Sequence, residues 1–204
     1  MQSRCARTGA SMRPEIRGEA GTASSLPDRL LVRPATPADA DALAQLGRAV
    51  GSEEEGWLIT ERDWRSASDE RRYLKSLRRY PHAAVFVAET AEGIIGRLSI
   101  ARDAHPASYH VADLGLMVAE GRRRQGVGTA LIQEALSWAR GAGIRKVELH
   151  VFPHNEPAIA LYEKLGFRRE GYRHRHYRRG RDYVDAILMA LDLDAEPGSQ
   201  SGAP

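Results

Sequence analysis

The sequence is short of several features that define common classes of protein. Among its 204 residues there is one cysteine, Cys5, so an intramolecular disulfide and a cysteine-based metal site are excluded. No run of apolar residues approaches the roughly 20 that a membrane-spanning helix needs, and the N-terminus lacks the apolar stretch of a secretory signal. These absences predict a cytoplasmic protein in a reducing setting.

An excess of charge of one sign is also missing. The chain has 30 Lys plus Arg against 27 Asp plus Glu, which leaves a formal net charge of +3. Such a balance does not demand a nucleic-acid partner. Its contents of 42% hydrophobic and 28% charged residues are ordinary for a globular protein, and its length suffices for one sizeable core.

Both ends of the chain lack apolar periodicity. Residues 1–28 are rich in Gly, Ser, Ala, Arg and Pro, so they have too little apolar surface to offset the entropy lost on ordering. We predict disordered tails at residues 1–28 and 194–204 around one domain of residues 29–193. Met12 within the first tail is an alternative start of the chain.

Between the tails, the patterns of strands and helices alternate. Thr36 and Pro37 open the first helix, because Thr suits the capping position and Pro the first helical position. A second helix is expected at 61–79, with Trp64 and Leu74 on one face, and further helices at 127–140 and 156–165. Strands are expected at 30–33, 84–88, 93–100, 112–118, 146–151, 167–173 and 183–191. This order predicts an α/β fold built on one sheet.

A glycine- and arginine-rich loop, Gly-Arg-Arg-Arg-Gln-Gly-Val-Gly at 121–128, precedes the third of these helices. A pyrophosphate needs several unpaired backbone N–H groups, and the start of a helix supplies them together with a favourable dipole. Gly126 and Gly128 allow the backbone to approach closely, and the arginines can add charge-assisted contacts. By itself the loop indicates only an anion site, and a solvated surface turn is an equal interpretation.

A second motif follows the strand expected at 146–151. It reads Asn-x-x-Ala-x-x-x-Tyr-x-x-x-Gly-Phe, from Asn155 through Tyr162 to Phe167. Together with Arg-x-x-Gly-x-Gly at 123–128, it makes residues 30–192 resemble the GNAT superfamily of N-acetyltransferases. The closing stretch, 170–189, is similar to bacterial members that include amino-acid and protein-terminus acetyltransferases.

The resemblance implies a single mixed, mostly antiparallel central sheet flanked by helices. Its fourth and fifth strands would splay apart, with the pantetheine arm of acetyl-CoA in the gap. The implied cofactor-binding residues are Met117, Val118, Arg123, Arg124, Gln125, Gly126, Val127, Gly128, Thr129, Asn155 and Tyr162. The implied partner is a small-molecule or peptide amine, with no metal, nucleic acid or membrane, and a homodimer is a common arrangement among relatives.

Acyl transfer to an amine requires a neutral nucleophile, a stabilised oxyanion and a proton for the departing thiolate. By the resemblance, Tyr162 is the general acid, and the alternative is a packing tyrosine. The candidates for the general base are Asp113, Glu148 and His150. Strand alternation puts Glu148 and His150 on one face, where a neutral imidazole could accept the proton of the amine. Many bacterial relatives carry a glutamate at the position of Asp113, and some protein-terminus acetyltransferases carry one at the position of His150, so this sequence departs from their pattern.

The acceptor is the least defined part of the predicted site. Glu53, Glu54 and Glu55 could attract a cationic amine or form a solvated loop. The basic stretch 173–181, with interleaved histidines and Tyr177, could bind a carboxylate, decorate a hairpin, or grip nucleic-acid phosphates and bases. We predict acetyl transfer to a small amine such as an amino acid. The second choice of acceptor is a protein N-terminus or a lysine. The alternatives of another class are a non-catalytic CoA-binding sensor and a nucleic-acid-binding module.

Overall fold

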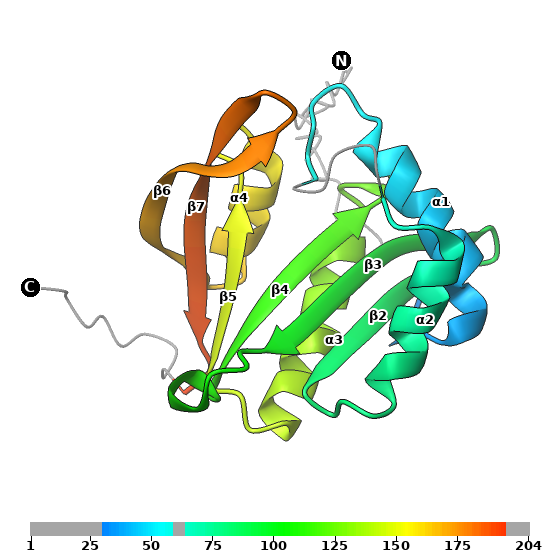
Figure 1. Cartoon of the computed structure of the whole chain (residues 1–204), viewed down its shortest axis with the longest axis horizontal. Helices are drawn as coiled ribbons and strands as arrows, with labels where there is room; N and C mark the ends of the chain where they lie inside the picture. Colours follow the sequence, from blue (N-terminus) through cyan, green and yellow to red (C-terminus); the bar gives the residue numbers. More distant parts are fainter. Residues whose placement is uncertain (1–29, 59–63, 195–204) are drawn as a thin grey trace, which may run out of the picture.

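The computed structural model describes residues 30–58 and 64–194 (Figure 1). The predicted tails lie outside the described residues, apart from Asp194. The Asp194 carboxylate accepts a hydrogen bond of 2.6 Å from the Arg145 guanidinium. Residues 61–63 of the predicted second helix also lie outside the described part.

Seven strands form one sheet in the order β1-β2-β3-β4-β5-β7-β6. Neighbouring strands are antiparallel except for β4 and β5, which are parallel. The single mixed, mostly antiparallel sheet is therefore confirmed. The strands are β1 (Leu31–Pro34), β2 (Ala83–Thr90), β3 (Gly93–Arg102), β4 (Val111–Val118), β5 (Lys146–Val151), β6 (Arg168–Arg179) and β7 (Asp182–Asp192).

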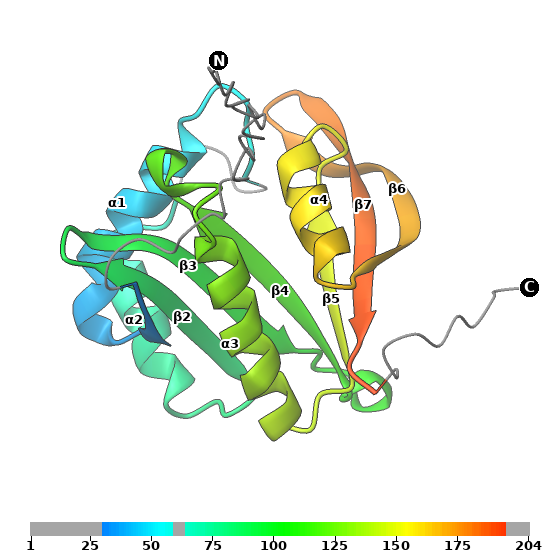
Figure 2. The ribbon, with the colours of Figure 1, turned by 180° about the vertical axis from the view of Figure 1, so that it is seen from behind.

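Helices cover both faces of this sheet. The α-helices are α1 (Ala40–Gly51), α2 (Ala67–Leu77), α3 (Val127–Gly141) and α4 (Glu156–Lys164). One face of the sheet, at β2 and β3, is covered by α1 and α2. The opposite face is covered by α3 and α4, which lie behind the sheet in Figure 1 and in front of it in Figure 2. Because both faces are covered, β2 carries four consecutive buried residues rather than an alternating pattern.

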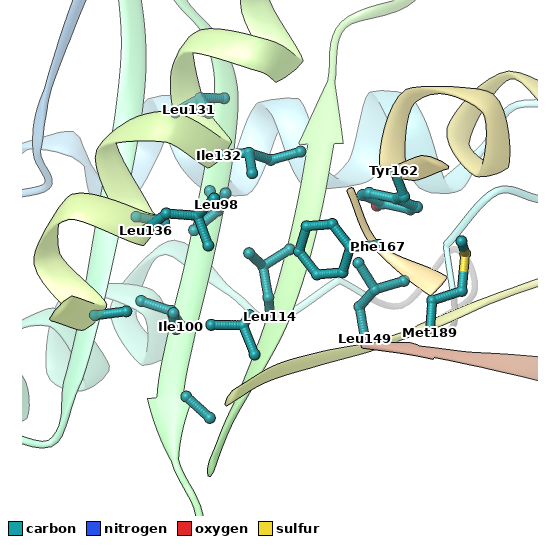
Figure 3. Packing of buried hydrophobic residues seen from close by; sticks show 14 of the residues in the cluster. Leu98, Ile100, Leu114, Leu131, Ile132, Leu136, Leu149, Tyr162, Phe167 and Met189 are labelled. Atoms are coloured by element: carbon teal, nitrogen blue, oxygen red, sulfur yellow. The ribbon is translucent and has the colours of Figure 1, made fainter. Parts of the chain in front are cut away.

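The main core lies between α3, α4 and the sheet. Leu131 and Ile132 on α3 are fully buried, as are Leu98 on β3 and Leu149 on β5. Figure 3 shows that these side chains share one cluster with Tyr162 beneath α4. Since each large apolar side chain contributes about 1.5–3 kcal/mol when buried, this cluster fixes α3 and α4 on either side of the boundary between β4 and β5.

The second helix is shorter than the sequence predicts. Its first residue is Ala67, because Ser66 is extended and its hydroxyl accepts a hydrogen bond of 3.1 Å from the Asp69 amide, which caps the helix there. The expected start near residue 61 is therefore wrong, and Trp64 precedes the helix. The indole of Trp64 packs instead against Gly47 of α1.

The strands β4 and β5 pair only at their beginnings. Three residue pairs join them, and the last is Asp113 with Glu148. Beyond it β5 stays paired with β7 along its whole length, while β4 stays paired with β3 (Figure 1). The second half of β4 therefore has an edge that faces no strand, which is the divergence that the resemblance implies.

Candidate active site

The glycine-rich loop leads into the N-terminus of α3, beside the diverging end of β4. Gly126 adopts a left-handed conformation (φ 81°), which glycine accepts at little cost. The first helical hydrogen bond runs from the Ala130 amide to the Gly126 carbonyl (3.0 Å), so the amides of Val127, Gly128 and Thr129 precede it. Among the described residues no side chain caps this terminus. Three N–H groups and the helix dipole thus point to one place.

Gly128 has a second role in the structure. A Cβ at this position would lie 3.0 Å from Cδ2 of Leu161 on α4. Glycine therefore lets the start of α3 lie close to α4, which carries Tyr162. The sequence indicated only the approach of the backbone to phosphate.

The arginines of the loop have different surroundings. The Nε of Arg123 donates to the Val118 carbonyl (3.1 Å), and its Nη2 lies 2.6 Å from each carboxylate oxygen of Glu53. Arg122 pairs with Glu92, and Arg124 is left-handed with φ 61°. Arg123 is thus turned toward the end of β4 and toward the acidic loop.

The acidic loop after α1 connects three parts of the molecule, and we call residues 52–58 the strap. Glu53 binds Arg123 of the glycine-rich loop. The Glu55 carbonyl lies 3.1 Å from Nε2 of His154, in the connection between β5 and α4. The Gly56 carbonyl accepts a hydrogen bond of 2.9 Å from Arg179 on the β6–β7 hairpin.

The strap changes the interpretation of its acidic residues. The side chain of Glu53 is 10% exposed and ion-paired, so it is not part of a solvated loop. Glu54 and Glu55 are exposed. Only these two keep their carboxylates open to a cationic ligand.

Tyr162 lies on the inner face of α4 (Figure 3). Its side chain is 6% exposed and its ring centroid lies 5.8 Å from that of Phe167. Burial raises the pKa of the Tyr162 hydroxyl, because the phenolate would lose its hydration. The hydroxyl is therefore protonated at neutral pH. Asn155 caps α4 by accepting a hydrogen bond of 3.2 Å from the Ala158 amide.

Two of the three base candidates stand on the last rung between β4 and β5. Part of the Asp113 side chain is exposed, yet the protein around its carboxyl reduces its hydration and raises its pKa to about 6. Repulsion from Glu148 acts in the same direction, and Arg173 opposes it. Glu148 itself is ion-paired with Lys146 at 2.8 Å. The surroundings of Asp113 thus favour the protonated form of its carboxyl.

His150 is the third candidate and lies two residues further along β5. Burial lowers the pKa of its imidazole, and Arg173 and His176 lower it further. Val147, Leu149 and Val151 are buried on the opposite face, so the predicted placement of Glu148 and His150 on one face is confirmed. The imidazole is therefore neutral at pH 7.

Tyr177 was missed as a site residue by the sequence analysis. Its hydroxyl lies 3.0 Å from Nδ1 of His150, and the ring of His176 lies 5.2 Å from the ring of His150. The only signal in the sequence was an aromatic residue within the basic stretch. The structure brings it to His150 because β6 continues to Arg179, beyond the expected end at residue 173.

Two further properties concern only the described residues. Within residues 30–58 and 64–194, no group of three or more His, Cys, Asp or Glu side chains is arranged to hold a metal ion. In the same ranges no helix combines the length and the apolar character needed to cross a bilayer.

Comparison with known proteins gives relatives that match part of the sequence. An L-amino acid N-acetyltransferase of Escherichia coli, AaaT, is 38% identical over 101 residues, which cover 48% of this chain and 60% of that protein. The N-alpha-acetyltransferase RimI of Mycobacterium tuberculosis is 36% identical over 115 residues, 55% of this chain and 68% of that protein. The chain thus spans less than two thirds of the length of the first of these relatives.

Solved structures agree with the fold. A GNAT-family acetyltransferase from Streptococcus pneumoniae superposes with a TM-score of 0.73 at 27% identity, covering 80% of this chain and 99% of that one. The protein yncA from Salmonella typhimurium, solved with acetyl-CoA, has a TM-score of 0.72 at 18% identity and covers 86% and 100%. At 18% identity, the similarity to yncA supports the fold alone.

The family model described as the acetyltransferase (GNAT) family matches residues 53–167. These residues contain the strap from Glu53 onward, the diverging strands, the glycine-rich loop and α4. The match covers more than half of the sequence and includes both motifs. This chain belongs to the acetyltransferase (GNAT) family.

Proposed function

We propose that the protein is an N-acetyltransferase that moves an acetyl group from acetyl-CoA to a primary amine, first of all a small one such as an amino acid. The observation that carries the proposal is the divergence of β4 and β5 beside the uncapped N-terminus of α3. A cytoplasmic setting is part of the same proposal.

The residues at this place fit acetyl-CoA, which when bound supplies the acetyl group as an activated thioester. The amides of residues 127–129 would hold the pyrophosphate, since the helix start offers them without competition from a capping side chain. The edge of β4 from Leu114 to Val118, which β5 leaves unpaired, would hold the pantetheine arm through its backbone. Met117 and Val118 stand at the end of this edge.

Tyr162 would supply the proton to the departing sulfur. Its raised pKa keeps the hydroxyl protonated at neutral pH, so the proton is present when the thiolate departs, although burial makes the hydroxyl a weaker acid. The position of Tyr162 on α4, whose Leu161 contacts the start of α3, is consistent with this role.

His150 would act as the general base, with Asp113 as the second candidate. A neutral imidazole can accept the proton of the attacking amine, and lowering of its pKa keeps it neutral. Glu148 is less suited, because Lys146 already occupies its carboxylate. No cysteine other than Cys5 exists, so direct transfer without a covalent acyl-enzyme is proposed.

The surroundings of His150 favour an acceptor that carries a carboxylate. Arg173 lies near enough to influence the pKa of both His150 and Asp113. A guanidinium beside the base suits the carboxylate of an α-amino acid. The E. coli relative is named for L-amino acids, while the M. tuberculosis relative is named for N-alpha-acetylation, so a protein N-terminus is the second candidate.

The test is acetyl-CoA consumption with a panel of amino acids, polyamines, aminoglycosides and short peptides, with CoA binding measured in parallel. Turnover that is largest with amino acids supports the proposal. Tight CoA binding without turnover on any amine would show a CoA-binding sensor instead. Binding to nucleic acid that falls steeply with salt, without CoA binding, would show the nucleic-acid module.

Tyr162→Phe is the specific test of the acid. We expect turnover to fall about 10²- to 10⁴-fold, the usual contribution of a positioned acid or base, while CoA affinity stays unchanged. Tyr80→Phe is the matched control, because Tyr80 is exposed and lies in the turn after α2. An unchanged rate in Tyr162→Phe would remove this residue from the mechanism.

A further inference from the structure

The β6–β7 hairpin contains an irregularity that lies next to His150. Arg173 pairs with Ala186 and Tyr177 with Val184, so three residues of β6 stand opposite the single residue Asp185 of β7. Bulges of this kind bend the strand and re-aim side chains, and they are frequent beside active sites.

Asp185 holds this bulge together. One carboxylate oxygen accepts a hydrogen bond of 2.6 Å from the amide of Arg175, and the other accepts one of 2.9 Å from the hydroxyl of Tyr172. Arg175 has φ 51°, in the left-handed region that non-glycine residues rarely adopt. The carboxylate of Asp185 thus stabilises a backbone conformation that would otherwise be unfavourable.

The result of the bulge is that Tyr177 reaches from the edge strand β6, across β7, to His150 on β5. The distance from the Tyr177 hydroxyl to Nδ1 of His150 is 3.0 Å. The ionisable groups that act on His150 are Glu148 on β5 and Arg173 and His176 on β6, while Asp113 on β4 and Arg173 act on Tyr177.

The other ring nitrogen of His150 decides the tautomer. Nε2 is buried and has no hydrogen-bond partner among the described residues. A buried N–H without a partner is among the least tolerated arrangements, whereas a buried lone pair without a partner is less rare. The proton of the neutral ring is therefore more stable on Nδ1, where it donates to the oxygen of Tyr177.

We propose that Tyr177 is a positioning residue that holds His150 as the tautomer protonated at Nδ1, which keeps the proton-accepting lone pair on Nε2. Because protein encloses Nε2 in the structure, binding of the amine has to open a path to this atom. As the C–N bond forms and the C–S bond breaks, Nε2 takes one proton from the attacking nitrogen while Tyr162 gives one to the sulfur. Tyr177 accepts the Nδ1 hydrogen bond throughout. The role in catalysis rests on the proposed function, but the tautomer does not.

The tautomer can be measured without any activity. In protein labelled with ¹⁵N at histidine, with His150 assigned from His150→Gln, the Nδ1 signal should be that of a protonated nitrogen and the Nε2 signal that of an unprotonated one above neutral pH. In Tyr177→Phe the two nitrogens should each move toward an averaged value. A protonated Nε2 in the wild-type protein would overturn the proposal, even if acetylation itself is established.

Kinetics test the positioning role with the best amine of the panel. Tyr177→Phe should lower kcat about 10- to 100-fold, as with groups that orient a metal-bound imidazole, and should leave the KM for acetyl-CoA unchanged. The limb of the pH profile that reports His150 should shift. Tyr183→Phe is the matched control, because Tyr183 is an exposed tyrosine of the same hairpin.

A double variant separates positioning from a general effect on the hairpin. In a His150→Gln background, Tyr177→Phe should cause no further loss of kcat, because the group that it positions is already gone. An equal loss in both backgrounds would show that Tyr177 acts only through the fold and would overturn the proposal.

Discussion

Two polar clusters lie near β4 and differ in how their charges are satisfied. The first, which we call the buried cluster, consists of Trp64, Glu70 and Arg97. Glu70 is 0% exposed and Arg97 5% exposed, and their nearest charged atoms are 3.4 Å apart. The second, which we call the hairpin cluster, consists of Asp113, His150 and Tyr177. Asp113 is exposed, and His150 and Tyr177 are partly exposed.

The cluster with the more deeply buried charges has fewer hydrogen bonds. Both carboxylate oxygens of Glu70, Nε of Arg97 and Nε1 of Trp64 are buried without a hydrogen-bond partner among the described residues. The hairpin cluster has a hydrogen bond of 3.0 Å between its two rings. Enclosed opposite charges hold each other in place but cannot change protonation without leaving an uncompensated charge. The hairpin cluster combines an imidazole whose pKa is lowered with a carboxyl whose pKa is raised to about 6, so its surroundings favour the neutral form of both groups.

The largest expected effect comes from removing one charge of the buried cluster. Glu70→Ala should lower the free energy of unfolding by about 3–5 kcal/mol, because Arg97 would be left buried without its partner. Urea denaturation measures this effect. The control is Glu70→Leu combined with Arg97→Met, which should recover most of the stability. A double variant as unstable as the single one would contradict the electrostatic explanation.

A smaller effect on stability should follow from displacing the indole of Trp64, which belongs to the buried cluster. A Cβ at Gly47 would overlap the ring of Trp64, which lies 5.3 Å from the guanidinium carbon of Arg97. Gly47→Ala should therefore destabilise the protein by about 1–3 kcal/mol through overpacking. Gly141→Ala on α3 is the matched helical control, because nothing lies within 4 Å of its Cβ. That control should stabilise by up to about 1 kcal/mol, and equal effects would refute the role of Trp64.

The smallest effect concerns the pH dependence that the hairpin cluster adds to stability. Folding raises the pKa of Asp113 from 3.8 to about 6, so the folded state binds this proton more tightly than the unfolded state. The stability that Asp113 contributes is fully present below pH 3.8 and is lost as the pH rises through about 6. Asp113→Asn removes this dependence.

Urea midpoints of wild type and Asp113→Asn, measured at several pH values, test this sign. The stability of Asp113→Asn relative to wild type should increase as the pH rises from about 4 to about 7. Asp182→Asn, at an exposed position of the hairpin, is the control for removing one carboxylate charge from this part of the protein. A constant difference for Asp113→Asn would mean that this carboxyl does not titrate differently in the folded protein.

Features that depend on near neighbours in sequence were predictable. The strand β5 occupies Lys146–Val151 as expected, because its apolar residues alternate strictly. The start of α3 at Val127 follows from the glycines that precede it. The divergence of β4 from β5 was accessible only through the resemblance, since no local pattern shows where two strands stop pairing.

Features that depend on distant pairs were not predictable. Glu53 and Arg123 are 70 positions apart, and each alone resembles an exposed charge. Tyr177 meets His150 only because a bulge in β6 changes the register, and that bulge depends on the carboxylate of Asp185. The true start of α2 required recognition of Ser66 as a cap within a stretch that also suits a helix.

The strap has a consequence for the order in which the protein folds. The hydrogen bonds that Glu53, Glu55 and Gly56 accept join residues 70, 99 and 123 positions apart. Such contacts form late, because closing long loops costs entropy that is recovered only after the intervening elements have assembled. These contacts are not part of a strand ladder or a helix. Local opening of the strap should therefore cost less free energy than opening of the sheet. Native-state hydrogen exchange should then find the amides of residues 53–58 among the least protected, although the strap contacts three parts of the domain.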